Sequence, residues 1–190
     1  MNYKFGVYGD SIAFGYGNNN QSWFDELYFE SQALKLAQNG EKIEDVLRKI
    51  KQDTNNYNTL FFAVGINNLL SENPKPNQID IENIVNQYEE VLKVARTKSL
   101  HIFVQSVLPV REELFPKQDW LNEDKWVFNA NIEAFNKSIA QLCKKYQIKF
   151  LDAYTNFYST DLSNLYIDAV HLNKAGQTEL AKIYKELLTY

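Results

Sequence analysis

A serine hydroxyl follows a glycine turn early in the sequence. Residues 3–8 are aromatic and β-branched, which predicts a buried strand, and Gly9 ends that strand where the backbone must turn sharply. Ligands of open α/β sheets bind beyond the carboxyl ends of the strands, so we expect Ser11 at the rim of a site, as a candidate nucleophile. The competing interpretation is that Ser11 or Asp10 only caps the next helix. We expect Asp10 to brace the turn by accepting backbone hydrogen bonds.

The chain contains two histidines, and a base that titrates near neutral pH must be one of them or a perturbed carboxylate. His101 falls near the amino end of a predicted strand, away from the crevice, and we interpret it as structural. His171 lies in a predicted loop before the last helix, three residues after Asp168. A carboxylate at this spacing can hold one ring nitrogen while the other faces a nucleophile. The candidate catalytic residues are therefore Ser11, His171 and Asp168.

Five apolar runs alternate with segments of helical periodicity, and this pattern predicts the elements that must position those residues. The predicted strands are 3–8, 33–37, 59–64, 100–107 and 148–152, and the predicted helices are 22–27, 43–50, 81–95, 132–146 and a last one from 174. Such alternation is typical of βαβ units, so we predict an α/β fold with a five-stranded parallel sheet in three α/β/α layers. We expect one domain over 1–190, with 111–128 as an excursion over the strand ends and 155–167 as loop.

Composition excludes several classes of function. The formal net charge is −4 without a basic run, which argues against nucleic-acid partners, and no apolar segment reaches the ~18 residues of a membrane span. We expect a cytoplasmic protein unless an export signal has been removed, and the oligomeric state stays open. We expect Cys143 to be a buried hydrophobe. His-Glu-x-x-His, paired cysteines and a Walker loop are absent, and the Gly15-x-Gly17 run lacks the third glycine of a dinucleotide site, so we predict no metal or cofactor.

Four blocks occur in an order that resembles the SGNH or GDSL hydrolase family over nearly the whole chain. They are Gly9-Asp10-Ser11, Gly40, Gly65-Ile66-Asn67-Asn68 and Asp168-Ala169-Val170-His171. The resemblance implies a flavodoxin-like fold, Ser11 as nucleophile, and Asp168 and His171 as the base. It also implies an oxyanion hole built from the Ser11 and Gly40 N–H groups and the Asn67 amide. The family usually has Asp where this chain has Asn68, and Ser or Thr around the glycine where this chain has Asn39 and Glu41.

The same residue types are what acyl transfer requires. A serine hydroxyl needs an adjacent base, and the tetrahedral intermediate needs donors where negative charge develops. The second glycine of the Gly-x-Ser-x-Gly elbow is missing, which counts against the ordinary α/β-hydrolase fold. We therefore predict a serine esterase that acts through an acyl-enzyme. The alternatives are a lipase or lysophospholipase, an acyltransferase using the same site, and a binding module without turnover.

Aromatic residues concentrate in 111–128 and 154–166. They either line a groove beside Ser11 or pack under two long loops. If rings face the crevice, flat faces beside polar groups suit a sugar better than a long acyl chain, which needs a continuous aliphatic trough. We accordingly predict a short acyl group, acetyl first, on a carbohydrate or another small polar alcohol. The candidate substrate contacts are Trp120, Trp126 and Tyr166.

Overall fold

A five-stranded, all-parallel sheet forms the middle layer of the protein, in the order β2-β1-β3-β4-β7. The computed structural model describes residues 2–27, 32–118 and 123–188. The strands are β1 (Asn2–Gly9), β2 (Ala33–Lys35), β3 (Asn56–Ala63), β4 (Ser99–Gln105) and β7 (Lys149–Leu151). The predicted parallel α/β sheet is thus confirmed, and its first strand lies between the second and the third.

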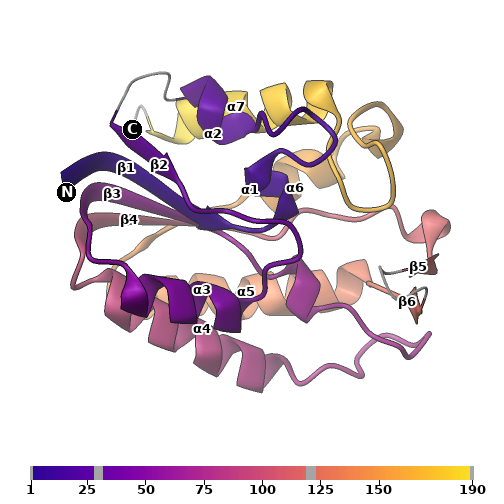
Figure 1. The fold of residues 1–190 in the computed structure, drawn as a ribbon. Coiled ribbons are helices and arrows are strands. Elements are labelled where there is room, and N and C mark those ends of the chain that lie inside the picture. The colour runs from indigo at the N-terminus through magenta and orange to yellow at the C-terminus, as the bar shows by residue number, and fades with distance from the viewer. Residues whose placement is uncertain (1, 28–31, 119–122, 189–190) are drawn as a thin grey trace.

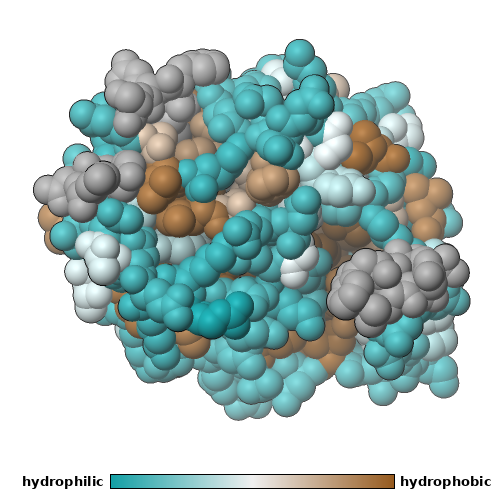
Figure 2. Space-filling model, viewed as in Figure 1, coloured by the Kyte–Doolittle hydropathy of each residue, from teal (hydrophilic) through white to brown (hydrophobic). Residues whose placement is uncertain are grey.

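Helices cover both faces of the sheet, which completes the predicted three layers (Figure 1). One face carries α3 (Ile43–Gln52), α4 (Ile81–Ala95) and α5 (Asn129–Tyr146). The other carries α1 (Ser11–Phe14), α2 (Trp23–Leu27), α6 (Ala153–Tyr158) and α7 (Lys174–Leu188). None of the described helices is long and apolar enough to cross a membrane. On the face that Figure 2 shows, the surface is mainly hydrophilic and its apolar residues form small separate groups.

Alternation along β3 divides the core into two halves. Leu60 and Phe62 pack with α3, α4 and α5, whereas Phe61 points to the opposite face. Successive strand residues point to opposite faces, so the run of apolar residues from Leu60 to Ala63 supplies both halves of the core. On the second face the Trp23 ring stacks on Tyr184 with centroids 3.9 Å apart. This contact fixes α2 and α7 beside the first residues after β1, where the candidate nucleophile lies.

Two segments hold more structure than their sequence predicts. The excursion 111–128 contains η2 (Glu112–Leu114) and an antiparallel pair, β5 (Lys117–Gln118) with β6 (Asp124–Lys125). The expectation of loop over 155–167 was wrong, because α6 runs to Tyr158 and η3 (Leu162–Asn164) follows. Asp152 starts α6 by accepting a hydrogen bond from the Thr155 N–H, a local signal that periodicity over so short a helix does not reveal.

Two expectations about single residues have different outcomes. Cys143 is buried in α5 with a free thiol, as expected of a small hydrophobe, and burial raises the pKa of that thiol to about 12. His101 lies in β4 as expected, but its side chain is exposed rather than packed in the interior. His101 is the third residue of β4 and lies near the amino end of the strand. It is therefore far from the carboxyl ends of the strands and does not line the candidate active site.

Candidate active site

The turn that presents Ser11 depends on close backbone packing. A Cβ at Gly9 would lie 2.6 Å from the Ala13 Cβ and 2.7 Å from the Ala63 carbonyl oxygen, so only glycine fits. Asp10 then caps α1, because its Oδ1 accepts a hydrogen bond of 3.1 Å from the Ile12 N–H. This is the bracing role expected from the sequence. Ser11 begins α1 with its side chain buried and its hydroxyl directed at His171. We call the segment 165–173, which lies before α7 and contains His171, the late loop.

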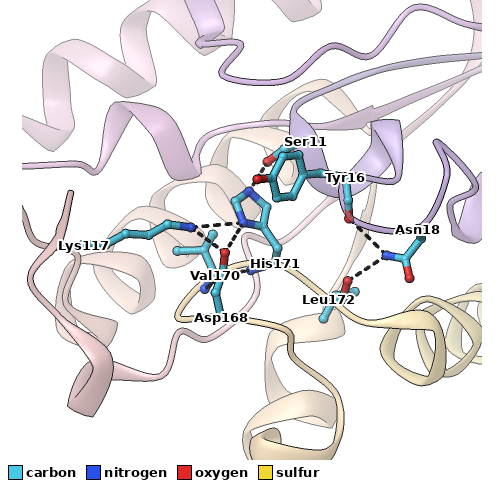
Figure 3. Close-up of polar contacts among 8 residues, drawn as sticks. All are labelled: Ser11, Tyr16, Asn18, Lys117, Asp168, Val170, His171 and Leu172. Atoms are coloured by element: carbon cyan, nitrogen blue, oxygen red, sulfur yellow. Dashed lines mark hydrogen bonds and ion pairs between the residues drawn. The ribbon is translucent and has the colours of Figure 1, made fainter. Parts of the chain in front are cut away.

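The late loop brings a histidine and a carboxylate to that hydroxyl (Figure 3). His171 Nε2 lies 2.9 Å from Ser11 Oγ, and His171 Nδ1 lies 2.8 Å from Asp168 Oδ2. The chain between the two partners is long, since Ser11 and His171 are 160 residues apart. The order hydroxyl, imidazole, carboxylate is that of a Ser-His-Asp triad, in which the carboxylate selects the tautomer with a free Nε2.

Asp168 is held ionised by four hydrogen-bond donors. Its Oδ1 accepts from the Val170 and His171 backbone N–H groups, at 2.8 and 2.7 Å. Its Oδ2 accepts from His171 Nδ1 and from the Lys117 ammonium, the latter at 2.6 Å. Burial acts to raise the pKa of Asp168, but these donors outweigh it and hold the pKa well below its usual range. Asp168 is therefore a permanent anion beside the imidazole.

A second contact joins the nucleophile segment to the base segment. Asn18 Nδ2 donates to the Leu172 carbonyl oxygen at 2.8 Å and to the Tyr16 carbonyl oxygen at 3.1 Å. The Tyr16 ring lies against the His171 imidazole with centroids 4.3 Å apart (Figure 3). Because these contacts bridge the loops on either side of the hydroxyl and imidazole, they limit how far Ser11 and His171 can separate.

Three candidate hydrogen-bond donors belong to residues that line one cavity, namely Ser11, Gly40 and Asn67. The N–H groups of Ser11 and Gly40 have no acceptor among the described residues. Asn67 Nδ2 donates one hydrogen to the Glu41 carbonyl oxygen at 2.9 Å, which orients the amide and leaves its second hydrogen available. Gly40 has φ +75° and a Cβ there would meet nothing within 4 Å, so the N–H is unobstructed and the backbone conformation favours glycine.

These groups open into one cavity of about 300 Å³. Polar and charged lining comes from Ser11, Tyr16, Asn39, Asn67, Lys117, Lys125 and His171, with Gly40, Ile66, Leu70 and Val170 completing the wall. The residues predicted for the nucleophile, its base and the oxyanion donors thus meet in one place, apart from Asp168, which lies behind His171. Their chemical roles remain predictions. Within the described ranges, no three His, Cys, Asp or Glu side chains gather as metal ligands.

Two buried acidic residues, Asp10 and Glu41, are the sequence neighbours of Ser11 and Gly40. Asp10 is 3% exposed, and burial raises the pKa of its carboxyl to about 7 even though backbone hydrogen bonds oppose the change. Glu41 is also buried and forms an ion pair with Lys49. Burial raises the pKa of Glu41 more than this partner lowers it. The ion pair attaches the 38–42 turn, and with it Gly40, to α3.

Two of the three predicted substrate contacts, Tyr166 and Trp126, do not line the cavity. Tyr166 is buried among the residues under α7, and its hydroxyl donates to the Pro109 carbonyl oxygen at 2.6 Å. Trp126 pairs through its backbone with Ser71 and does not line the cavity. Trp120 lies outside the described residues. Among the described residues, the aromatic side chain that lines the cavity is that of Tyr16, for which the sequence predicted no role.

Lys117 was also missed. Its ammonium lies 2.6 Å from Asp168 Oδ2 and 3.2 Å from His171 Nδ1 (Figure 3). It comes from the aperiodic excursion, 51 residues before Asp168. No local pattern marks a lysine in such a segment, so the sequence alone carried no signal for it.

A parallel three-layer α/β fold with a hydroxyl, imidazole and carboxylate aligned beyond the strand ends defines the architecture of a serine hydrolase. Residues 7–178 match the GDSL-like lipase/acylhydrolase family, and the chain belongs to that family. It is therefore a carboxylic ester hydrolase by family, and esters are its substrates. The resemblance inferred from the four sequence blocks is confirmed.

Solved structures share the fold at low sequence identity. A member of the lipolytic G-D-S-L family from Veillonella parvula is 17% identical, with 98% of each chain covered and a TM-score of 0.74. A putative platelet activating factor protein from Streptococcus pneumonia is 21% identical, covering 99% of this chain and 85% of that one, with a TM-score of 0.74. A catalytic mutant of an acetylxylan esterase from Geobacillus stearothermophilus is 13% identical, covering 97% and 93%, with a TM-score of 0.70. None of the curated proteins matches the sequence.

Proposed function

We propose that the protein is a serine esterase that removes a short acyl group from a small molecule or a carbohydrate by way of an acyl-enzyme. Acetyl is the leading candidate for that acyl group. The alignment of Ser11 Oγ, His171 Nε2 and Asp168 carries this proposal, with separations of 2.9 and 2.8 Å. With its Nδ1–H donated to Asp168, His171 accepts the Ser11 proton at Nε2 as the oxygen attacks the ester carbonyl carbon. His171 then returns that proton to the departing alcohol, which leaves the acyl group on Ser11.

Three donors supply the electrostatic part of the reaction: two backbone N–H groups and the second hydrogen of an amide whose first hydrogen is already bonded. Negative charge develops on the carbonyl oxygen when the tetrahedral intermediate forms, and donors already aimed at that position stabilise it without reorganisation. We assign this role to the Ser11 N–H, the Gly40 N–H and the Asn67 amide. A water molecule activated by His171 then releases the acid by the same steps in reverse, and Ser11 is regenerated.

The size and lining of the cavity support a short acyl group. Its volume of about 300 Å³ is at the lower end of the range for small-molecule sites. Among the described residues the aliphatic wall consists of Ile66, Leu70 and Val170, which is too short to form the long apolar trough that a fatty acyl chain requires. Acetylxylan esterases are among the structures that share this fold, so a carbohydrate is the first alcohol part to test in the ester substrate.

A chain-length series tests the proposal. We expect p-nitrophenyl acetate to be hydrolysed, with a steep fall in kcat/KM beyond four carbons, and a fluorophosphonate probe to label wild type but not Ser11→Ala. Acetate release from acetylated xylooligosaccharides, compared with glycerol triacetate, tests the carbohydrate part. Activity that peaks at eight carbons or more would replace the acetyl assignment with a lipase or lysophospholipase. Absence of both turnover and labelling would remove the esterase.

A further inference from the structure

Lys117 contacts the candidate triad although it belongs to a different part of the chain. It lies on β5, which pairs with β6 in the excursion 111–128, and its side chain reaches inward to Asp168 and His171 (Figure 3). The side chain is one-third exposed and also lines the cavity beside Ser11. An ammonium group thus stands between the solvent-filled cavity and the carboxylate that orients the base.

This ammonium group competes with His171 for Asp168. His171 Nδ1–H and Lys117 both donate to Asp168 Oδ2, so the carboxylate divides its negative charge between two donors. The imidazole becomes positive when it takes the Ser11 proton, and a second positive charge 3.2 Å from Nδ1 opposes that step. Movement of the ammonium away from Asp168 would remove both effects.

The excursion does not need Lys117 to stay over the site. The Arg111 N–H donates to the Ala169 carbonyl oxygen at 2.9 Å, and Ser71 and Trp126 exchange two backbone hydrogen bonds of 2.8 and 3.0 Å. These contacts hold both ends of the segment independently of the lysine. The ion pair of Lys117 with Asp168 is therefore not explained by anchoring alone.

The charges on the cavity wall indicate what draws the ammonium away. Among the described lining residues the charged side chains are Lys117 and Lys125, and no carboxylate faces the cavity. Lys125 is partnered by Glu72 and Glu123, whose side chains are 80% and 54% exposed. Lys125 is itself only 14% exposed, but its two partners are open to solvent, and ion pairs with exposed partners contribute little. An anion in the cavity therefore meets two cations at the wall, and the carboxylates that pair with them are not among the described lining residues.

On the basis of the esterase function proposed above, we propose that Lys117 is a specificity-determining residue for substrates with an anionic group. A carboxylate, sulfate or phosphate on the alcohol part of the ester takes the Lys117 ammonium from Asp168. Asp168 then serves His171 alone, and the base acts at full strength only on a substrate that carries the charge. A neutral ester leaves Lys117 on Asp168 and is hydrolysed more slowly.

Two matched chromogenic acetates test this. 5-Acetoxy-2-nitrobenzoate carries a carboxylate, and 5-acetoxy-2-nitrobenzamide has the same skeleton without charge. We expect the wild type to favour the carboxylate in kcat/KM by at least about tenfold. Lys117→Met should lose that preference. It should also hydrolyse the acetate ester of the uncharged benzamide about three- to tenfold faster through kcat, because the charge beside His171 Nδ1 is gone. Lys117→Arg should keep the preference. Lys93→Met, which removes an exposed lysine of α4 paired with Glu90, is the matched control.

The outcomes separate this inference from the proposed function. Hydrolysis of both acetates that depends on Ser11 but shows no preference for the carboxylate overturns the role of Lys117 and leaves the esterase intact. An equal loss on both substrates in Lys117→Met shows that the lysine is only a structural support. Absence of turnover on either acetate overturns both proposals. If Lys117→Met does not fold, as thermal unfolding will show, Lys117→Gln serves as the neutral variant.

Discussion

Replacement of Asn67 by alanine isolates the oxyanion donor that a side chain provides. The amide is oriented by its 2.9 Å hydrogen bond to the Glu41 carbonyl oxygen, and Asn67 lines the same cavity as Ser11. Loss of one such donor costs about 2.7–4 kcal/mol of transition-state stabilisation, so kcat should fall by about 10²–10³-fold. KM should change little, because the donor acts on charge that the ground state does not carry.

Asn68→Ala is the matched control, one residue along the same turn. Its side chain accepts from the Ile43 N–H at 2.9 Å and donates to Glu44 Oε2 at 2.9 Å, so it caps α3 and does not line the cavity. We expect it to lower the free energy of unfolding by about 1 kcal/mol while kcat stays close to wild type. Steady-state hydrolysis of p-nitrophenyl acetate and thermal unfolding provide the two readouts. The reasoning is refuted if Asn67→Ala retains kcat within about threefold, or if Asn68→Ala loses as much.

Three further predictions follow from the same geometry. Ser11→Ala and His171→Ala should each abolish most turnover, and the double variant should be no slower than either single one, because both act in one proton transfer; losses that multiply would contradict this. Asp10→Asn should keep the helix cap and gain stability relative to wild type as pH rises from 4 to 7, since a folded-state pKa of about 7, above the unfolded value, makes the fold lose stability on ionisation. The gain, by urea unfolding, is at most ~4 kcal/mol, and a difference independent of pH would argue against it. Trp23→Ala should cost ~3–5 kcal/mol of unfolding free energy, because its ring is fully buried against Tyr184; a loss under ~1 kcal/mol would show that the core refills the space.

Much of the fold was predictable because its signals are local. The strand β3 is apolar at successive positions from Leu60, a pattern typical of a strand that is covered on both faces. Its neighbours β1 and β4 also contain successive apolar residues. The Gly9 turn and the first three blocks follow strands of the sheet, so their convergence follows from parallel topology, whereas the fourth block lies in the loop before α7. Short elements without a clear hydrophobic period were not predicted from the sequence, as α6 and the β5–β6 pair show.

By itself the sequence determined which residues could act as nucleophile, base and oxyanion donors. The nucleophile and the donors are marked by their type and their place after a strand, and the base is marked by the scarcity of histidine and by the spacing of Asp168 and His171. The tertiary structure decided which side chains share the cavity. It placed Tyr16 against His171 and Tyr166 in the interior, although both are tyrosines of loop segments. It also brought Lys117 across 51 residues to Asp168. The direction of a side chain in an aperiodic segment depends on contacts with distant parts of the chain, and those contacts exist only once the layers have packed.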